Sequence, residues 1–141
     1  MTVQYIDEVE FGSEIENSSV DTSLGNVSTF AEAVGWNAAR FQDHDKAKKE
    51  GLPGALVPGI MGVGFLSGMI HAWAPTARIV SIDTVFRAPM LADAALTLSA
   101  IVTDIDEREA RVELDLTVRN QKDETRLFGT AIVEFPRRGM A

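Results

Sequence analysis

The sequence predicts an α+β fold in which an antiparallel sheet wraps around one buried helix. The first observation is an apolar segment, residues 60–73, that follows a Gly- and Pro-rich loop and is too interrupted and too short for a membrane span. The second is that apolar and polar residues alternate with a period of two from residue 78 onward. The third is that the connections within this second part are short and polar. One buried helix followed by an antiparallel meander is typical of an α+β domain.

The bulk composition limits the classes of partner. A chain of 141 residues is expected to form one domain over 1–141, and it contains no cysteine for a disulfide, a thiolate nucleophile or a cysteine-bound zinc ion. The net charge of −8 disfavours nucleic acid and anionic membranes as main partners. The first residues lack a basic segment followed by an apolar run, so we expect no signal peptide and a cytoplasmic location.

The first third of the chain predicts a weak strand and two short helices. Residues 14–22 are a plausible strand, and Ser23 can cap the helix that follows. The apolar residues of that helix are spaced at i, i+3, i+4 and i+7, and Gly35 ends it. Asp43 can cap a charged helix, HDKAKKE, which Gly51 ends. The segment LPGALVPG is expected to be a loop.

The central helix, Ile60 to Trp73, is apolar on nearly all sides, which predicts that it is buried. It contains Gly62, Gly64 and Gly68, and each glycine costs about 1 kcal/mol relative to alanine inside a helix. We expect these glycines to allow close packing of the helix backbone against a sheet or against another chain.

Four strands are expected after this helix, at residues 78–86, 94–104, 110–118 and 126–135. The third strand alternates most regularly, so one face is expected to be dry and the other wet. A sheet that wraps around one hydrophobic helix is the hot-dog arrangement. Its edge strand stays unpaired, and such edges are usually covered, so we expect a dimer at least.

Several motifs in chain order resemble one family. Gly35 and Asp43 are followed by AKK at 47–49, VPGIM at 57–61, FRAPM at 86–90 and a closing segment, NQKDETRLFGTAIVEF, at 120–135. On these residues the chain resembles a MaoC-like domain, the single hot-dog domain of (R)-specific enoyl-CoA hydratases and related acyl dehydratases. The resemblance covers residues 11–135 and leaves 136–141 as a tail. The family motif reads G-D-x-N-P-x-H, followed by an acidic residue two positions later.

The resemblance implies that Trp36 stands where the family has its catalytic Asp, and Phe41 where it has its catalytic His. In the family these two groups flank a water molecule and move protons between it and the enoyl thioester, which needs titratable side chains. Trp and Phe cannot do this, so little hydratase activity is expected. The two aromatic residues either plug the old site or line a larger apolar pocket for an acyl or polycyclic substrate.

The resemblance also implies a site for the thioester carbonyl at the start of the central helix. The backbone N–H of Gly59, next to Ile60, would form the oxyanion hole, helped by the helix dipole. The alternative is that Gly59 is only a turn residue after Pro58. Thioester binding is therefore expected to persist where catalysis does not.

Four other side chains are weaker candidates for a role in the site. His44 is a displaced base or, by default, a solvated residue of the charged helix. His71 is a candidate base or a packed residue near a helix end, and Asp83 is a candidate acid or a residue on the wet face of a strand. Arg40 adjoins the position of the missing His and either binds an acyl-CoA phosphate or carboxylate or forms a surface ion pair. Arg137 and Arg138 are expected to be a solvated tail, with contact to CoA phosphates as the alternative.

Three hypotheses follow from these residues. The first is a non-catalytic subunit that pairs with a related, dyad-bearing MaoC-like chain in an acyl-CoA or acyl-carrier-protein dehydratase. The second is a homodimeric enzyme with altered chemistry, a thioesterase or an atypical hydratase that uses His44, His71 or Asp83. The third is an acyl-thioester binding or purely structural protein. No cofactor or metal is expected beyond the CoA or carrier thioester of the substrate.

Overall fold

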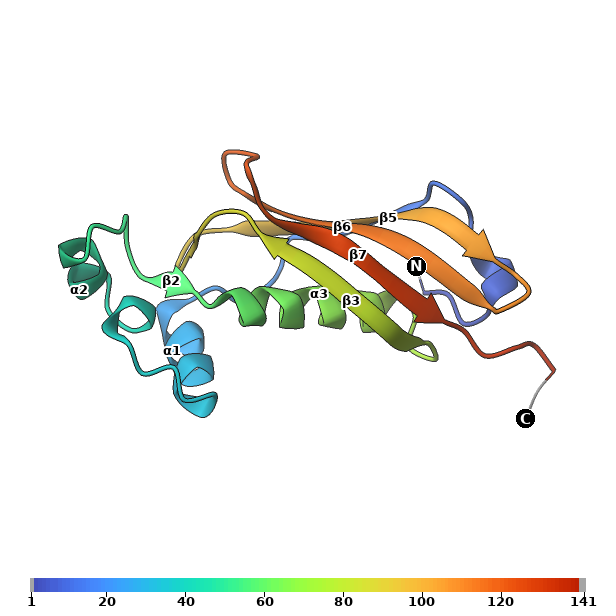
Figure 1. The fold of residues 1–141 in the computed structure, drawn as a ribbon, viewed down its shortest axis with the longest axis horizontal. Helices are drawn as coiled ribbons and strands as arrows, with labels where there is room; N and C mark the ends of the chain where they lie inside the picture. Colours follow the sequence, from blue (N-terminus) through green and yellow to red (C-terminus); the bar gives the residue numbers. More distant parts are fainter. Residues whose placement is uncertain (1, 140–141) are drawn as a thin grey trace.

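The computed structural model describes residues 2–139 of the chain. Its main sheet has five antiparallel strands in the order β1–β5–β6–β7–β3 (Figure 1). The strands are β1 (Glu14–Asn17), β3 (Arg78–Phe86), β5 (Leu96–Asp106), β6 (Arg111–Asn120) and β7 (Thr125–Glu134). Strands β5, β6 and β7 pair consecutively, which confirms the predicted meander.

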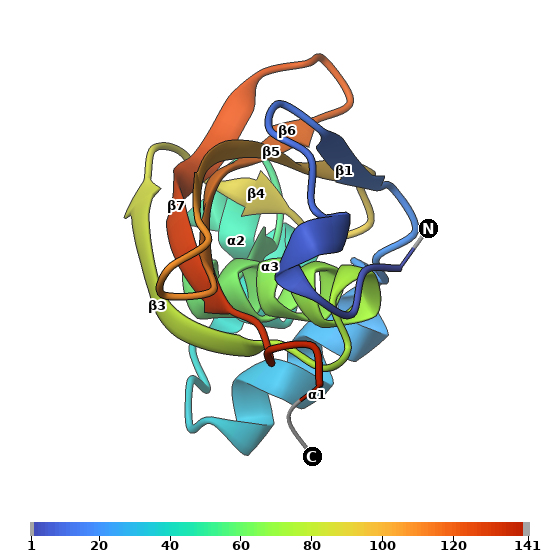
Figure 2. The same ribbon diagram turned by 90° about the vertical axis from the view of Figure 1, so that its right-hand side faces the viewer.

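The helix α3 (Gly59–Trp73) lies in the concave face of this sheet, and Figure 2 shows the sheet curving around it. Alternate residues of the strands point at the helix because side chains alternate between the two faces of a sheet. Together they form the core; its fully buried members include Leu66 and Ile70 of α3 and Leu98, Leu114, Leu127 and Val133 of the strands. The predicted hot-dog arrangement is thus confirmed.

Two helix starts were placed correctly from their capping residues. Ser23 accepts a hydrogen bond from the Asn26 N–H at the start of α1 (Leu24–Ala33). Asp43 accepts one from the Lys46 N–H at the start of α2 (His44–Lys49), and that bond lowers the pKa of the Asp43 carboxyl. Together with the short 3₁₀ helix η2 (Ala39–Phe41), these helices form a lobe at one end of the molecule (Figure 1).

Several boundaries differ from the sequence prediction. Strand β1 ends at Asn17 and does not reach residue 22, because the Asn17 side chain accepts hydrogen bonds from Ser19 and the chain turns there. Strand β5 starts two residues later than expected, after a turn in which Asp93 has a φ of 61°. A two-residue ladder, β2 (Leu56–Val57) with β4 (Met90–Leu91), was not predicted.

The composition of the central helix predicted burial on nearly all sides, but the structure leaves one side of it exposed. One stripe of α3 is exposed in this chain, and it consists of Ile60, Gly64, Gly68 and Ala72. The strand beside it, β3, pairs with β7 on one side and is the last strand of the sheet on the other.

The end of the molecule opposite the helical lobe is held by ion pairs. Glu134 of β7 accepts hydrogen bonds from Arg78 of β3 and Arg111 of β6, which lower the pKa of the Glu134 carboxyl. Arg138 makes a bidentate pair with Asp7, at 3.0 and 2.9 Å, and its guanidinium lies 4.3 Å from the centre of the Tyr5 ring. Both Arg137 and Arg138 are exposed, as expected for a solvated tail, and the pair with Asp7 anchors Arg138 on the surface.

Candidate functional site

An apolar groove opens where the helical lobe meets the start of α3 and the end of β3. Its volume is about 680 Å³. Residues that are far apart in sequence meet here. They come from the loop before η2, the β2–β4 ladder and the first turn of α3. The residues that line the groove are Trp36, Phe41, Leu56, Val57, Gly59, Ile60, Phe86, Arg87, Ala88, Pro89 and Met90.

Trp36 and Phe41 form one wall of the groove. Their ring centres are 5.6 Å apart and the ring planes are tilted by 37°, a geometry favoured between aromatic side chains. The backbone N–H of Trp36 donates to the Ala31 carbonyl at 2.7 Å, and Gly35 before it has a φ of 80°, so the end of α1 fixes the backbone that carries the indole. Trp36 keeps 41% of its surface exposed. The two aromatic residues line an open groove and do not fill it.

The start of α3 presents backbone donors to the same groove. Pro58 is the N-cap residue and offers no capping side chain, and its carbonyl accepts from the N–H groups of Met61 and Gly62. The N–H groups of Gly59 and Ile60 lie in the first turn, where no acceptor exists within the helix. The Phe86 ring packs against Gly59 so closely that a Cβ there would lie 2.7 Å from Cε1 of the ring. Glycine is therefore needed for this packing, and its role as an oxyanion hole remains a prediction.

The groove is nearly free of titratable side chains. Of the residues that line it, within the part of the chain that the structure describes, Arg87 alone carries a charge. Its backbone N–H donates to the Arg126 carbonyl at 2.9 Å, which holds the segment after β3 against β7. A smaller polar cleft of about 340 Å³ shares Pro89 with the groove and contains Lys122, Glu124 and Arg126.

The other candidates lie outside the groove. Arg40 forms an ion pair with Glu50 at 3.3 Å, as its default interpretation predicted. His71 is exposed in the last turn of α3, about 18 Å along the helix from Gly59. Asp83 is exposed and lies opposite Thr130 in the ladder, on the sheet face that points away from α3.

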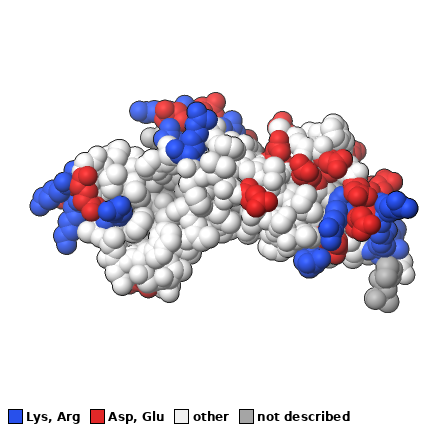
Figure 3. All heavy atoms as spheres, viewed as in Figure 1, with Lys and Arg blue, Asp and Glu red and all other residues white. Residues whose placement is uncertain are grey.

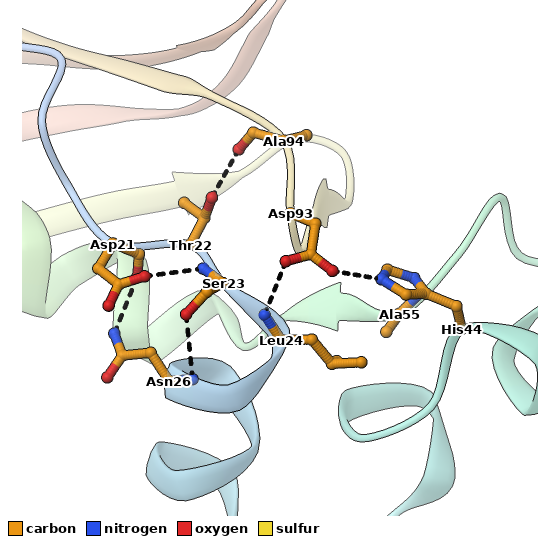
Figure 4. A network of polar contacts seen from close by, with 9 residues as sticks. All are labelled: Asp21, Thr22, Ser23, Leu24, Asn26, His44, Ala55, Asp93 and Ala94. Carbon is orange, nitrogen blue, oxygen red and sulfur yellow. Dashed lines mark hydrogen bonds and ion pairs between the residues drawn. The ribbon is translucent and has the colours of Figure 1, made fainter.

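His44 lies in the first turn of α2, as expected, and 33% of its side chain is exposed, but both of its ring nitrogens are hydrogen-bonded. Its Nδ1 accepts the Ala55 N–H at 2.9 Å, and its Nε2 lies 2.8 Å from the Asp93 carboxylate (Figure 4). An acceptor Nδ1 requires the proton on Nε2, which therefore donates to Asp93. Asp93 also accepts the Leu24 N–H at 2.9 Å. The hydrogen bond from His44 is the main reason that the pKa of Asp93 lies below its usual value, and the bond from Leu24 adds to it. This network ties α1, α2 and the β4–β5 turn together.

The sequence did not identify seven groove residues as part of a site: Leu56, Val57, Phe86, Arg87, Ala88, Pro89 and Met90. The segment FRAPM was noticed only as a strand end. The signal that was missed is the pair of prolines, Pro58 and Pro89, which stand beside two short apolar segments that become β2 and β4.

No family model and no curated protein matches the sequence. Among solved structures, R-hydratase PhaJ1 from Pseudomonas aeruginosa is similar, with a TM-score of 0.87, 19% identity, and coverage of 95% of this chain and 86% of that chain. The chain has the hot-dog fold of these hydratases.

Two further similar structures are complexes from Mycobacterium tuberculosis. The ChsH1-ChsH2 complex matches with a TM-score of 0.75 and 20% identity, covering 96% of this chain and 100% of that chain. The HadBC complex, a (3R)-hydroxyacyl-ACP dehydratase, matches with a TM-score of 0.66 and 15% identity, covering 87% and 96%. At these identities the likeness concerns the fold.

Residues 2–139 also bear on two other classes of site, a membrane span and a metal centre. No helix in this range is long and apolar enough to cross a membrane. No group of three or more histidine or acidic side chains in it is placed to hold a metal ion.

Proposed function

We propose that this chain is a non-catalytic, MaoC-like subunit of a cytoplasmic acyl-thioester hydratase or dehydratase. It pairs with a related chain that carries the Asp/His dyad, and it contributes binding surface for the acyl part of an acyl-CoA or acyl-carrier-protein substrate. The observation that carries the proposal is the chemistry of the groove wall. Trp36 and Phe41 both line the groove, and the motif resemblance puts them at the two positions where the family transfers protons. Neither side chain can exchange a proton near pH 7.

The rest of the groove supports binding of an acyl thioester. Its lining is apolar and aromatic, which suits a hydrocarbon chain. The free N–H groups of Gly59 and Ile60 at the helix start suit a carbonyl oxygen. The similar folds of a hydratase and of two dehydratase-type complexes support the same class of ligand and a partner of related fold.

The alternative of a homodimeric enzyme with altered chemistry requires a base in the groove. Both ring nitrogens of His44 are already hydrogen-bonded. His71 lies near the far end of α3, and Asp83 points away from the helix. None of these three side chains lines the groove. The placement of the candidates therefore favours the non-catalytic proposal.

The test is hydration of a short and a long trans-2-enoyl-CoA by the purified chain alone, followed by loss of the conjugated thioester absorbance. We expect no turnover above background, and turnover when the dyad-bearing chain is added. Losing two acid–base groups removes about 10²–10⁴-fold each. Turnover by the chain alone would refute the proposal and would direct mutation to His44, His71 and Asp83.

A further inference from the structure

The His44 ring connects the helical lobe to the segments on both sides of the β2–β4 ladder. Its Nδ1 accepts the Ala55 N–H at 2.9 Å, and its Nε2 donates to the Asp93 carboxylate across 2.8 Å (Figure 4). Ala55 is the last residue before β2, and Asp93 lies in the turn between β4 and β5. His44 itself is the first residue of α2. One imidazole ring therefore holds three segments that are distant in the sequence.

The backbone N–H of Ala55 depends on this ring for its hydrogen bond. Ala55 is 0% exposed, so water does not reach it in place of the ring nitrogen. The ring lies close to the backbone here, because a Cβ added at Gly54 would be 3.0 Å from the His44 Nδ1. A buried N–H that loses its acceptor is costly, so the position of Ala55 is coupled to the state of the ring.

The same contact joins two parts of the groove. Both residues of β2 line the groove and come directly after Ala55 in the chain. The Ala55 carbonyl accepts the Ala92 N–H at 2.9 Å, so the start of β2 is held to the segment after β4. On the lobe side, Phe41 of the aromatic wall lies three residues before His44. Loss of the contact between His44 and Ala55 would therefore let the aromatic wall and β2 move relative to each other.

Protonation of His44 removes this contact. Nε2 already carries the proton of the neutral ring, so a second proton from the solvent binds at Nδ1. The Nδ1–H and the Ala55 N–H would then be two donors facing each other across 2.9 Å, and one of them must move. The backbone at Ala55 is held by the β2–β4 ladder, so the ring and α2 are the parts that move.

The charged groups that face the ring are carboxylates. They are Asp93 in the β4–β5 turn and Asp43 at the start of α2, and the pKa of each lies below its usual value. Asp21, before α1, lies close enough to Asp93 to be affected by its charge. The loop 51–55, GLPGA, has no charged residue. Figure 3 shows the charged side chains of α2 in a group of their own at the left end of the molecule. The carboxylates stay ionised in mild acid, so the ring is the group whose charge changes there.

We propose that His44 is a positioning residue of the groove, and that proton uptake at its Nδ1 releases β2 from the helical lobe and weakens acyl-thioester binding. Histidine side chains ordinarily titrate at about pH 6.5, so the groove responds to mild acid. The ligand in this inference rests on the proposed function, whereas the release of the Ala55 N–H does not.

Two amide variants separate the two contacts of the ring. The side-chain oxygen of Asn lies where Nδ1 lies in histidine, so His44→Asn keeps an acceptor for Ala55 but takes up no proton in mild acid. The side-chain nitrogen of Gln reaches the place of Nε2, so His44→Gln keeps a donor for Asp93 but loses the acceptor for Ala55. His71→Asn is the matched control, because His71 is the other histidine of the chain and is exposed in the last turn of α3.

The wild-type chain and the three variants are titrated by NMR from about pH 7.5 to about pH 5, on both sides of the ordinary histidine value. The ring nitrogens report the protonation of His44, and hydrogen exchange reports the protection of the Ala55 N–H relative to an unfolded chain. In the wild type and in His71→Asn, protection should fall at least about tenfold as the ring takes up its second proton. His44→Asn should stay protected throughout, and His44→Gln should lack this protection at every pH. The affinity for octanoyl-CoA, measured by calorimetry on the same samples, should follow the same order.

Several results would overturn the proposal. One is an Ala55 N–H that stays protected beside a doubly protonated His44 ring, and another is a ring that stays neutral down to about pH 5. A third is full protection of Ala55 in His44→Gln. An octanoyl-CoA affinity that does not change while Ala55 is released would refute the link to the groove. Failure of octanoyl-CoA to bind any of the four chains at any pH would count against the proposed function, while the protection of Ala55 would still decide the role of His44.

Discussion

Gly129 is the residue whose replacement by alanine should perturb the sheet most directly. It lies in β7 opposite Thr84 of β3, at a point where the two backbones approach closely. A Cβ at this position would overlap the Asp83 carbonyl oxygen and lie 2.8 Å from the Thr84 Cα. Both of these atoms belong to the backbone, so no side chain can rotate away, and β3 itself must shift.

The magnitude follows from overpacking. An added methyl group in a packed site lowers the free energy of unfolding by about 1–3 kcal/mol. Because the clash at Gly129 is with backbone, we expect Gly129→Ala to lower it by about 3 kcal/mol. The unfolding entropy of about 2.1 cal/mol/K per residue gives about 0.3 kcal/mol/K for this chain, so the expected fall in Tm is about 10 °C. The assay is thermal unfolding by circular dichroism at one protein concentration, with urea unfolding as a second measure.

Gly25→Ala is the control for this prediction, because its added Cβ meets nothing and its position is helical and exposed. It should melt at or slightly above the wild-type temperature. A Gly129→Ala chain that melts within about 2 °C of the wild type, a shift too small for a backbone clash, would refute the close approach of β3 and β7 and the argument built on it.

Three further predictions concern the groove, the lobe and the core. Trp36→Ala should weaken binding of a saturated acyl-CoA about tenfold, because an aromatic wall of the groove is lost. Val34 is an exposed apolar residue outside the groove lining, so Val34→Ala should leave the affinity unchanged. Both affinities are measured by titration calorimetry, and equal values for the two variants would remove Trp36 from the site. Asp93→Asn should lower the Tm at pH 7, and this loss should become smaller as the pH falls below about 3.9. The folded state lowers the pKa of Asp93, so its stabilisation is present above the unfolded value of about 3.9 and is lost as the pH falls through the lower folded value. Asp45→Asn on α2 is the control, and a difference in Tm that is as large at low pH as at pH 7 would contradict the role of the carboxylate. Leu66→Ala should reduce the free energy of unfolding by about 2–5 kcal/mol, because Leu66 is fully buried in the core. Phe11 is exposed, so Phe11→Ala should change this free energy little. A small loss for Leu66→Ala in urea unfolding would contradict the placement of α3.

The fold was predictable because its main elements are long and periodic. The alternation in residues 111–118 survives in β6, where Val112, Leu114, Leu116 and Val118 are all buried. The β2–β4 ladder was not predictable, since two residues are too few to show a period. The exposed stripe on α3 was hidden for another reason: glycine and alanine count as apolar in a sequence whether they face a core or a partner.

The candidate site was predictable in part. Trp36, Phe41 and Gly59 were singled out by their positions in a resembling motif, and the structure brings them into one groove with Ile60. Phe86 and Arg87 could not be placed in the same way, because only the antiparallel course of β3 along α3 brings the end of the strand to the start of the helix. His44 could not be judged from its neighbours, since its partner Asp93 is 49 residues away in the chain.

The contact of Arg138 with Asp7 and Tyr5 has a practical consequence for handling the protein. It holds the two ends of the described chain together at the end of the molecule opposite the groove (Figure 1). A fluorophore, spin label or surface tether attached beside Tyr5 or Arg138 would therefore leave the groove facing free solution. Ligand and partner measurements on an immobilised chain can use either terminus without obstructing the groove.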